Sequence, residues 1–205
     1  MTTPSAEQID WAKGGGLVPA IVQDADTQQV LMLGYMNADA LAATRASGKV
    51  TFFSRSKGRL WTKGETSGHT LTFVDVTVDC DNDALLVSAR PIGPTCHRGT
   101  TSCFGNEGAT GAGFLAQLDG IVASRLASPD AAASYTARLA AEGIKRVAQK
   151  VGEEGVEAAL AGAGGTDTEV AGEAADLLFH LIVLLRVRGL KLTDAIEVLE
   201  KRHRK

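Results

Sequence analysis

The sequence predicts two domains, a strand-rich α+β domain followed by an all-α domain. The composition of the 205-residue chain changes near residue 105. β-branched residues, turns and all three cysteines precede this point, and alanine, leucine and glutamate dominate after it. Residues 106–113 have the composition of a flexible, glycine-rich linker. We therefore assign residues 1–105 and 114–205 to separate domains.

The first domain is predicted to contain short strands and one helix. Asn37 is a predicted N-cap for a helix over residues 38–46 that ends near Gly48. This amount of helix is too small for a wound parallel sheet. The first two of its strands are expected to form a hairpin. The predicted strands are residues 17–24, 30–35, 50–53, 71–78 and 84–89.

The second domain is predicted to be helical throughout, because apolar residues recur at helical spacing. Gly162 to Gly165 is expected to separate two helices, and Gly189 to end another. The predicted helices are residues 114–126, 135–142, 144–161, 169–188 and 193–202.

The overall composition excludes several classes of protein. Apolar residues make up 44% and charged residues 22%, which is ordinary for a globular protein. A net charge of −3 gives no basic field for nucleic acid. No apolar run is long enough to span a membrane, and residues 1–13 lack a signal-peptide core. We expect a cytoplasmic protein without nucleic-acid or membrane partners.

The cysteines and a run of acids predict metal sites. Cys80 lies within the run Asp79-Cys80-Asp81-Asn82-Asp83, and Cys96 and Cys103 follow. Three thiols match the protein-ligand count of a catalytic zinc. The three aspartates supply hard oxygens, which favour Mg²⁺. In an extended segment these aspartates would share one face and Cys80 would occupy the other.

The cysteines admit other interpretations. A disulfide leaves one cysteine unpaired and lacks an oxidising compartment. A calcium-binding EF-hand loop is excluded, because Ala84 and Arg90 stand where it needs glycine and glutamate. A structural zinc with His97 as fourth ligand remains open, as does burial of free thiols without metal.

The segment of residues 54–69 carries four cations, three glycines and Trp61. Arginine and lysine bind phosphate, and glycine lets backbone N–H groups approach it. The indole of Trp61 could stack on a base. The alternative is an exposed hairpin with a solvated basic face.

Two predicted helices of the second domain carry acids at helical spacing. Glu153, Glu154 and Glu157 are neighbours on one helix, and Glu173 and Asp176 are neighbours on another. Facing helices build Mg²⁺ or Mn²⁺ sites from such carboxylates. The alternative is a solvated acidic face.

Burial favours the metal interpretation over the solvated one. An apolar run over residues 177–185 predicts that the second acidic helix is buried around much of its girth. Buried carboxylates need partners or metal. Lys150 lies just upstream and could bind phosphate or pair with the acids. His180 and His203 are predicted to be packing or surface residues.

These motifs resemble a known enzyme family. The N-terminal patterns Leu60-Trp61-x-Lys63-Gly64-Glu65-Thr66-Ser67-Gly68-His69, Asp79-Cys80-Asp81-x-Asp83 and Cys96-His97-x-Gly99-x-x-Ser102-Cys103-Phe104 resemble phosphoribosyl-AMP cyclohydrolase. The helical acid pattern resembles phosphoribosyl-ATP pyrophosphohydrolase, an α-helical relative of the MazG group. Their order is similar to that of the bifunctional enzymes of histidine biosynthesis.

The resemblance implies two consecutive hydrolyses. The C-terminal domain would release pyrophosphate from phosphoribosyl-ATP, and Lys150 would contact this substrate. The N-terminal domain would then open the adenine ring of phosphoribosyl-AMP between N1 and C6. His97 is the candidate for proton transfer, and Glu65 is a second candidate catalytic residue.

The resemblance also implies metals, substrate contacts and assembly. Zinc would lie on Cys80, Cys96 and Cys103, with its ligands shared across the interface of a homodimer. Mg²⁺ would lie on Asp79, Asp81 and Asp83 in the N-terminal domain. A second Mg²⁺ site would use Glu153, Glu154, Glu157, Glu173 and Asp176. The implied substrate contacts are Arg55, Lys57, Trp61, Lys63, Gly64, Glu65, Ser67, Gly68 and His69.

Two rival functions differ in their products. A MazG-like nucleotide pyrophosphohydrolase would release pyrophosphate from ordinary nucleoside triphosphates without ring opening. A non-enzymatic zinc module on a helical dimerisation domain would hold zinc with four protein ligands.

Overall fold

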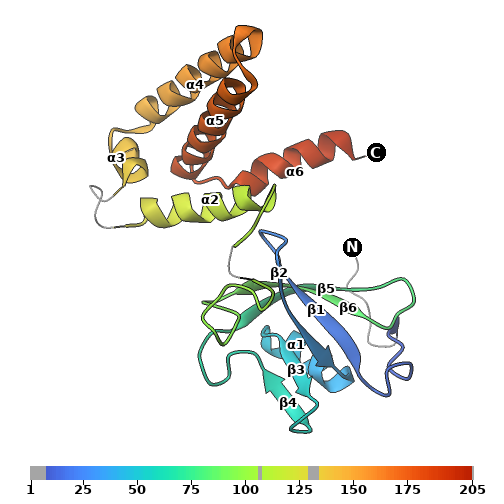
Figure 1. The fold of residues 1–205 in the computed structure, drawn as a ribbon. Coiled ribbons are helices and arrows are strands. Elements are labelled where there is room, and N and C mark those ends of the chain that lie inside the picture. The colour runs from blue at the N-terminus through green and yellow to red at the C-terminus, as the bar shows by residue number, and fades with distance from the viewer. Residues whose placement is uncertain (1–7, 106–107, 129–133, 205) are drawn as a thin grey trace. The chain divides into compact units, whose positions relative to one another are not determined.

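The computed structural model describes residues 8–105, 108–128 and 134–204. The chain divides into two compact units, Met1–Phe114 and Leu115–Lys205. The first unit is rich in strands and the second is built from helices (Figure 1). Within the described ranges, no helix is both long and apolar enough to cross a membrane.

The N-terminal unit is built on a four-stranded sheet with the order β2-β1-β6-β5. β1 (Val18–Asp24) pairs antiparallel with β2 (Val30–Met36), which confirms the predicted hairpin. On its other side β1 runs parallel to β6 (Leu85–Pro91), and β6 pairs antiparallel with β5 (Leu71–Val78).

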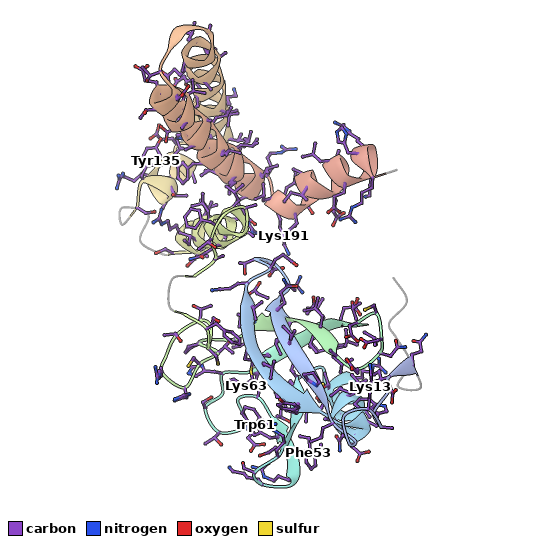
Figure 2. The ribbon with its side chains drawn as sticks, turned by 45° about the vertical axis from the view of Figure 1, so that its right-hand side comes forward. Lys13, Phe53, Trp61, Lys63, Tyr135 and Lys191 are labelled. Carbon is purple, nitrogen blue, oxygen red and sulfur yellow. The ribbon has the colours of Figure 1, made fainter. Side chains whose placement is uncertain are left out.

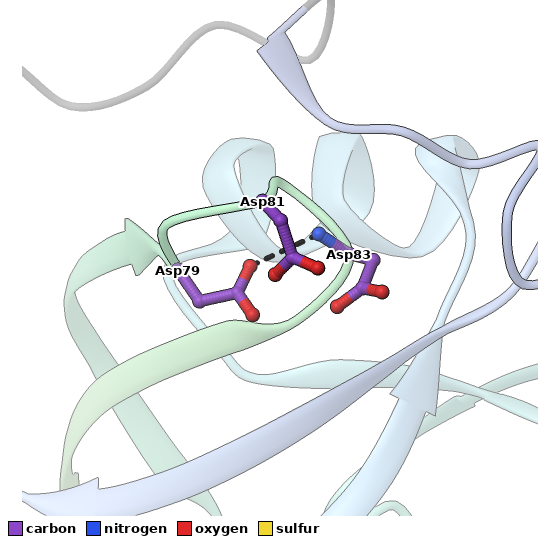
Figure 3. A group of neighbouring side chains, drawn as sticks. All are labelled: Asp79, Asp81 and Asp83. Atoms are coloured by element: carbon purple, nitrogen blue, oxygen red, sulfur yellow. Dashed lines mark hydrogen bonds between the residues drawn. The ribbon is translucent and has the colours of Figure 1, made fainter.

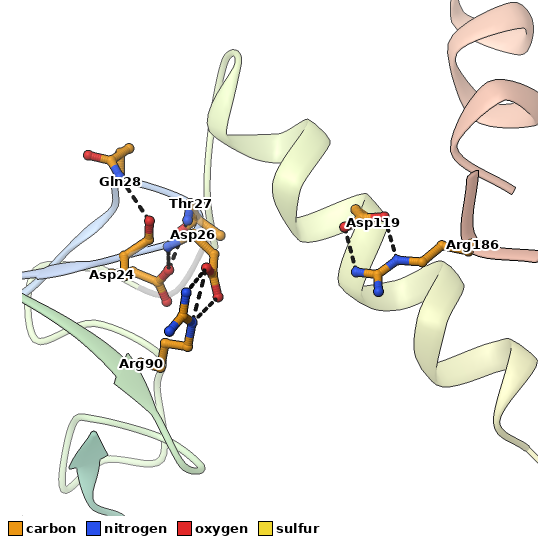
Figure 4. A network of polar contacts seen from close by, with 8 residues as sticks. Asp24, Asp26, Thr27, Gln28, Arg90, Asp119 and Arg186 are labelled. Atoms are coloured by element: carbon orange, nitrogen blue, oxygen red, sulfur yellow. Dashed lines mark hydrogen bonds and ion pairs between the residues drawn. The ribbon is translucent and has the colours of Figure 1, made fainter. Parts of the chain in front are cut away.

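The turn between β1 and β2 is held by its own polar groups. The carboxylate of Asp24 accepts hydrogen bonds from the N–H groups of Asp26 and Thr27, both at 2.8 Å (Figure 4). Arg90 donates to both carboxylate oxygens of Asp26. The side chain of Arg90 therefore ties this turn to the end of β6.

One face of the sheet is covered by α1 (Ala38–Ser47) and by the hairpin of β3 (Thr51–Ser54) and β4 (Arg59–Thr62) (Figure 1). Val18, Ala20 and Val22 alternate along β1 and are fully buried in this core. The hairpin packs tightly, because a Cβ at Gly34 would lie only 2.3 Å from the ring of Phe52.

The predicted limits of α1 are confirmed. Asn37 caps the helix by accepting a hydrogen bond from the N–H of Ala40 at 2.8 Å. Gly48 ends it in the left-handed region with a φ of 67°. The sequence does not predict β4, because this strand is only four residues long and lies in a charged, glycine-rich segment.

The run of aspartates is not extended, so the alternation considered for an extended segment does not apply. β5 ends at Val78, and residues 79–84 form a turn in which Asn82 has a φ of 64°. One oxygen of Asp79 accepts hydrogen bonds from the N–H groups of Asp83 and Ala84, both at 3.0 Å. This bonding curls the segment, so its side chains do not alternate as they would on a strand.

The second unit consists of helices packed around an apolar core. Asp119 and Arg186 form a two-pronged ion pair within it, joining the first and fourth helices (Figure 4). Val122, Val147 and Ile182 are fully buried in the core. The helices are α2 (Gly113–Leu126), α3 (Tyr135–Ala141), α4 (Ile144–Gly164), α5 (Asp167–Val187) and α6 (Leu192–His203).

Two helical predictions need correction. The glycines expected to separate helices instead continue α4 to Gly164, since each costs a helix only about 1 kcal/mol relative to alanine. The break lies at Gly165, and Thr166 caps α5. α5 is less buried than its apolar run predicts, because Leu178 is 41% exposed and Asp176 is exposed.

Candidate active sites

A cavity of about 660 Å³ opens in the N-terminal unit. This volume is typical of sites for small organic ligands. Its walls come from the segment after β4 and from the loop that carries two of the cysteines. The lining residues are Met32, Trp61, Lys63, Gly64, Glu65, Thr66, Ser67, His69, Pro94, Thr95, Cys96, His97, Gly99 and Cys103.

Two glycines let the chain fold closely around His69. Gly64 has a φ of 82°, and a Cβ there would lie 2.4 Å from the carbonyl oxygen of His69. A Cβ at Gly93 would lie 2.2 Å from Nδ1 of His69. Neither position has room for a side chain, so the glycines shape this wall of the cavity.

Trp61 lies on β4, and Lys63 comes directly after this strand ends at Thr62 (Figure 2). The indole of Trp61 stacks on Phe52 with a centroid distance of 5.6 Å, which anchors it to the core. Lys63 is buried, and its ammonium donates to the carbonyl of His69 at 3.3 Å. The basic segment therefore begins with the β3–β4 turn, and its second half, from Trp61 to His69, lines the cavity.

Cys96 and Cys103 meet beside Lys63. Burial lowers the pKa of Lys63, while the neighbouring thiolates of Cys103 and Cys96 oppose this change. A hydrogen bond from the backbone of Arg98 lowers the pKa of Cys96. Burial raises the pKa of Cys103, and the charge of Cys96 adds to this effect. The two thiols of the pair therefore differ, because the surroundings favour ionisation of Cys96 and disfavour ionisation of Cys103.

His97 also borders the cavity. Its Nδ1 lies 3.9 Å from Sγ of Cys96, and the side chain is exposed. The imidazole is therefore free to face a molecule in the cavity while remaining next to a thiol.

Cys80 does not join the other two thiols within one chain. It is exposed on the turn between β5 and β6 and is absent from the cavity lining. Among the described residues, the three cysteines do not form one metal-sized group. Within one chain the cysteines are therefore a pair, Cys96 and Cys103, and a separate thiol, Cys80.

The three aspartates of the same turn do gather. Asp79, Asp81 and Asp83 place ligand oxygens within 4.8 Å of one another (Figure 3). Lys13 reaches this group, with its ammonium 2.5 Å from Asp81 and 2.9 Å from Asp83. The hydrogen bond from Lys13 lowers the pKa of Asp81. Nothing in the sequence pattern marks Lys13, because the pairing joins segments far apart in the chain.

Other predicted contact residues hold protein partners. Glu65 accepts from Arg59 at 2.6 Å, and this hydrogen bond lowers the pKa of Glu65. The guanidinium of Arg55 lies 3.7 Å from the centroid of the Tyr35 ring, a cation–π contact. Arg55 and Lys57 lie on the β3–β4 turn and do not line the cavity. Gly68 is not a lining residue either, but it lies between Ser67 and His69, which are.

Three acids converge between α4 and α5. Glu154, Glu157 and Glu173 place ligand oxygens within 4.8 Å of one another. Desolvation raises the pKa of Glu173, and the charges of Glu157, Glu154 and Asp176 add to this effect. Mutual repulsion of this kind is relieved by a bound cation.

Lys150 binds the acids at one side of this cluster. Its ammonium lies 2.9 Å from Glu153 and 2.8 Å from Glu154, and these hydrogen bonds lower the pKa of both carboxyls. Glu153 also accepts from Gln149 at 2.7 Å, so it stands apart from the three converging acids. Lys150 was predicted either to bind phosphate or to pair with the acids, and the structure shows the pairing with the acids.

His180 is buried, in agreement with the predicted packing role, but both ring nitrogens have polar partners. Nδ1 lies 2.9 Å from the carbonyl oxygen of Asp176, and Nε2 lies 3.0 Å from the hydroxyl of Tyr135. The sequence signal for the first contact is the spacing of four residues on one helix, and no sequence signal marks the second.

Comparison with known proteins assigns each region to a family. Residues 32–105 match the phosphoribosyl-AMP cyclohydrolase family, and residues 116–203 match the phosphoribosyl-ATP pyrophosphohydrolase family. The cavity and the acid cluster each lie within one of these matches. The chain is therefore a bifunctional hydrolase.

Full-length relatives share this arrangement. The histidine biosynthesis bifunctional protein HisIE of Xanthomonas campestris is 61% identical over 97% of this chain and 94% of its own length. The HisIE protein of Escherichia coli K12 is 57% identical over 99% of both chains. The chain belongs to this family, and its two regions catalyse two hydrolytic steps of histidine biosynthesis.

Proposed function

We propose that the helical region acts first, on the α–β phosphate bond of phosphoribosyl-ATP. Glu154, Glu157 and Glu173 would hold Mg²⁺, with Asp176 and Glu153 completing the acidic surroundings. The oxygen donors of this cluster fit Mg²⁺. Mg²⁺ would neutralise triphosphate charge and help to activate water. The family match to phosphoribosyl-ATP pyrophosphohydrolase and the MazG-like acid pattern support this assignment.

Lys150 is proposed to change partners during binding. Its ammonium pairs with Glu153 and Glu154 in the structure. A cation that displaces this ammonium from Glu154 would leave it next to the bound triphosphate, where it can donate to phosphate oxygens. Glu153 would keep the side chain near the site.

The N-terminal region is proposed to open the ring of phosphoribosyl-AMP. Zinc would lie on Cys96 and Cys103 of one chain and on Cys80 of a second copy in a homodimer. The exposure of Cys80 and the meeting of Cys96 with Cys103 support this shared site. Thiolates suit zinc, which would supply a water with a pKa near neutrality.

His97 is proposed to transfer the proton. Its imidazole borders the cavity next to Cys96, within reach of a ligand there. Glu65 is less suited to that task, because its ion pair with Arg59 favours the carboxylate and makes it a weak base. Glu65 therefore serves better to hold the cavity wall.

Substrate recognition is proposed to divide between the cavity and its surroundings. Trp61, Lys63, Ser67 and His69 line the cavity and would contact base, ribose and phosphate. Gly64 and Gly68 would allow backbone N–H groups to approach phosphate. Arg55 and Lys57 lie outside the lining and would reach only the distal phosphate.

Asp79, Asp81 and Asp83 are proposed to hold a further Mg²⁺ near a substrate phosphate. The clustering of their oxygens fits this ion. Lys13 would then be displaced from Asp81 and Asp83. We also propose a cytoplasmic location, where the free cysteines remain reduced and able to bind metal.

The observation that carries the two-site proposal is the presence of a thiol-lined cavity and a carboxylate cluster in separate family matches. A product assay tests it. Purified protein receives phosphoribosyl-ATP, Mg²⁺ and Zn²⁺, and pyrophosphate and the ring-opened imidazole-carboxamide product are followed together. Both products are expected. Pyrophosphate alone, also formed from ordinary nucleoside triphosphates, would favour a MazG-like pyrophosphohydrolase with a non-catalytic zinc module.

A further inference from the structure

His180 lies at a junction of three helices in the C-terminal unit. It comes from α5, and its partners are Glu154 on α4 and Tyr135 at the start of α3 (Figure 2). His180 and Glu154 are each only 5% exposed. Polar groups buried to this degree require hydrogen-bond partners, so their arrangement is fixed by the fold.

The hydrogen bonds of His180 determine where its protons lie. Nδ1 is 2.9 Å from the backbone carbonyl oxygen of Asp176. A carbonyl only accepts, so Nδ1 carries a hydrogen. Nε2 is 3.0 Å from the hydroxyl of Tyr135, which donates to it when the ring is neutral. Nε2 therefore already has a hydrogen-bond partner within the protein.

The same nitrogen, Nδ1, also lies close to the acid cluster. Nδ1 lies 3.5 Å from Oε1 of Glu154, the oxygen that also lies 2.8 Å from the ammonium of Lys150. Glu154 therefore has the ammonium of Lys150 and the imidazole of His180 as neighbours on one side. These two contacts restrict the position of Glu154, which is the only buried carboxylate among the three acids that converge.

Aromatic packing holds the ring of His180 in this orientation. Phe179 meets it edge to face at 5.1 Å between centroids, and Tyr135 does so at 5.9 Å. Tyr135 and Phe179 also contact each other at 6.3 Å. Rotation of the imidazole would break both of its hydrogen bonds and this packing.

We propose that the Tyr135–His180 pair positions the carboxylate of Glu154 and the helical turn of Asp176 for cation binding in the pyrophosphohydrolase site. The inference rests on the proposed function of this cluster as a Mg²⁺ site. His180 is a positioning residue, because its nitrogens contact protein groups rather than substrate. Polar groups in contact with ligating carboxylates help to set their orientation and contribute to metal affinity.

The test uses His180→Leu, His180→Asn and Tyr135→Phe in the full chain. The side-chain N–H of asparagine can reach the place of Nδ1–H, whereas leucine offers no donor. Two variants serve as controls. Thr136→Val removes the neighbouring buried hydroxyl of α3, which has no hydrogen-bond partner among the described residues. His203→Asn changes an exposed histidine of α6.

Two readouts separate positioning from general stability. The first is the Mg²⁺ concentration for half-maximal pyrophosphate release, measured together with kcat. The second is Mn²⁺ binding followed by electron paramagnetic resonance, in chains carrying D79N, D81N and D83N so that only the helical region titrates. The far-ultraviolet circular dichroism of the helices reports that the C-terminal unit of each variant is folded.

We expect His180→Leu to weaken Mn²⁺ binding and raise the half-saturating Mg²⁺ concentration by about 10-fold or more. His180→Asn should recover most of this loss, and Tyr135→Phe should show a smaller effect of the same kind. Both controls should match wild type. Unchanged metal dependence in His180→Leu would overturn the inference, as would equal defects in the leucine and asparagine variants.

Two provisions keep the result decisive. If His180→Leu does not fold, Tyr135→Phe decides, and an unchanged half-saturating Mg²⁺ concentration in that variant overturns the inference. Glu154→Gln is measured in parallel. If Glu154→Gln leaves metal dependence unchanged, the proposed Mg²⁺ site itself fails. If Glu154→Gln weakens metal binding and the His180 variants do not, only the positioning role fails.

Discussion

The two regions of this chain assemble their candidate metal sites in different ways. In the helical region, acids of α4 and α5 meet within one chain, and spacing along the helices already brings them close. In the N-terminal region, Cys96 and Cys103 share a cavity while Cys80 lies on a separate, exposed turn. Helix pairs can complete a site locally, whereas sites built on loops depend on tertiary or quaternary structure.

The largest expected effect comes from removing a thiol. Cys103→Ala should reduce ring opening by about 100-fold or more, because activation of water by a metal contributes several kcal/mol. Cys80→Ala should be equally damaging, although Cys80 lies outside the cavity of its own chain. Pyrophosphate release should be unchanged in both variants. Substantial ring opening by Cys103→Ala would refute the zinc site.

A comparable loss is expected in the other region when its acids are changed. Glu154→Ala or Asp176→Ala should reduce pyrophosphate release by about 100-fold, since Mg²⁺ would lose a ligand or nearby charge. Ring opening of phosphoribosyl-AMP supplied directly should continue at the wild-type rate. Equal loss of both activities would contradict the separation of the sites.

Glycine substitutions should have opposite effects on the two regions. Gly64→Ala should destabilise the N-terminal unit by about 1–3 kcal/mol, because its φ is positive and a Cβ would meet the carbonyl of His69. Gly152→Ala should stabilise α4 by up to about 1 kcal/mol, since this helical position is open. The free energy of unfolding of both variants is measured by chemical denaturation.

Gly58→Ala is the matched control for the first of these substitutions. Gly58 has a φ of 61°, and a Cβ added there would meet no atom within 4 Å. Only the backbone penalty of about 1–2 kcal/mol therefore applies at this position. A loss in Gly64→Ala no larger than in Gly58→Ala would show that the close approach to His69 is unimportant.

The smallest expected effect concerns pH and the Arg59–Glu65 ion pair. Arg59 lowers the folded-state pKa of Glu65. The stabilisation of the folded state by this ion pair is therefore present above the unfolded-state pKa of about 4.3. It is lost as pH falls through the lower folded-state pKa. Glu65→Gln should lower the thermal midpoint at pH 7 but not in strong acid. A midpoint difference that does not depend on pH would exclude this ion pair as its cause.

The parts of the fold that were predicted correctly are governed by local rules. Asn37 and Gly48 mark the ends of α1 because capping depends on adjacent residues. The pattern of acids on α4 and α5 is read from helical spacing for the same reason. Local rules do not give the shape of the turn of residues 79–84, where the carboxylate of Asp79 accepts hydrogen bonds from two backbone N–H groups.

The parts that the sequence does not predict depend on contacts between distant segments. Lys13 reaches Asp81 across 68 residues, and Tyr135 reaches His180 across 45. The division of the cysteines between a cavity and an exposed turn is likewise a result of tertiary structure. No spacing rule encodes that Cys80 lies apart from Cys96 and Cys103.

Mixing two inactive variants tests the shared zinc site most directly. Cys80→Ala and Cys103→Ala chains are purified, unfolded together, refolded with Zn²⁺ and assayed for ring opening. In a mixed dimer one site would combine Cys80 of one chain with Cys96 and Cys103 of the other. Random pairing then predicts recovery of about a quarter of the wild-type rate. Activity no higher than that of either variant alone would contradict a site shared between chains.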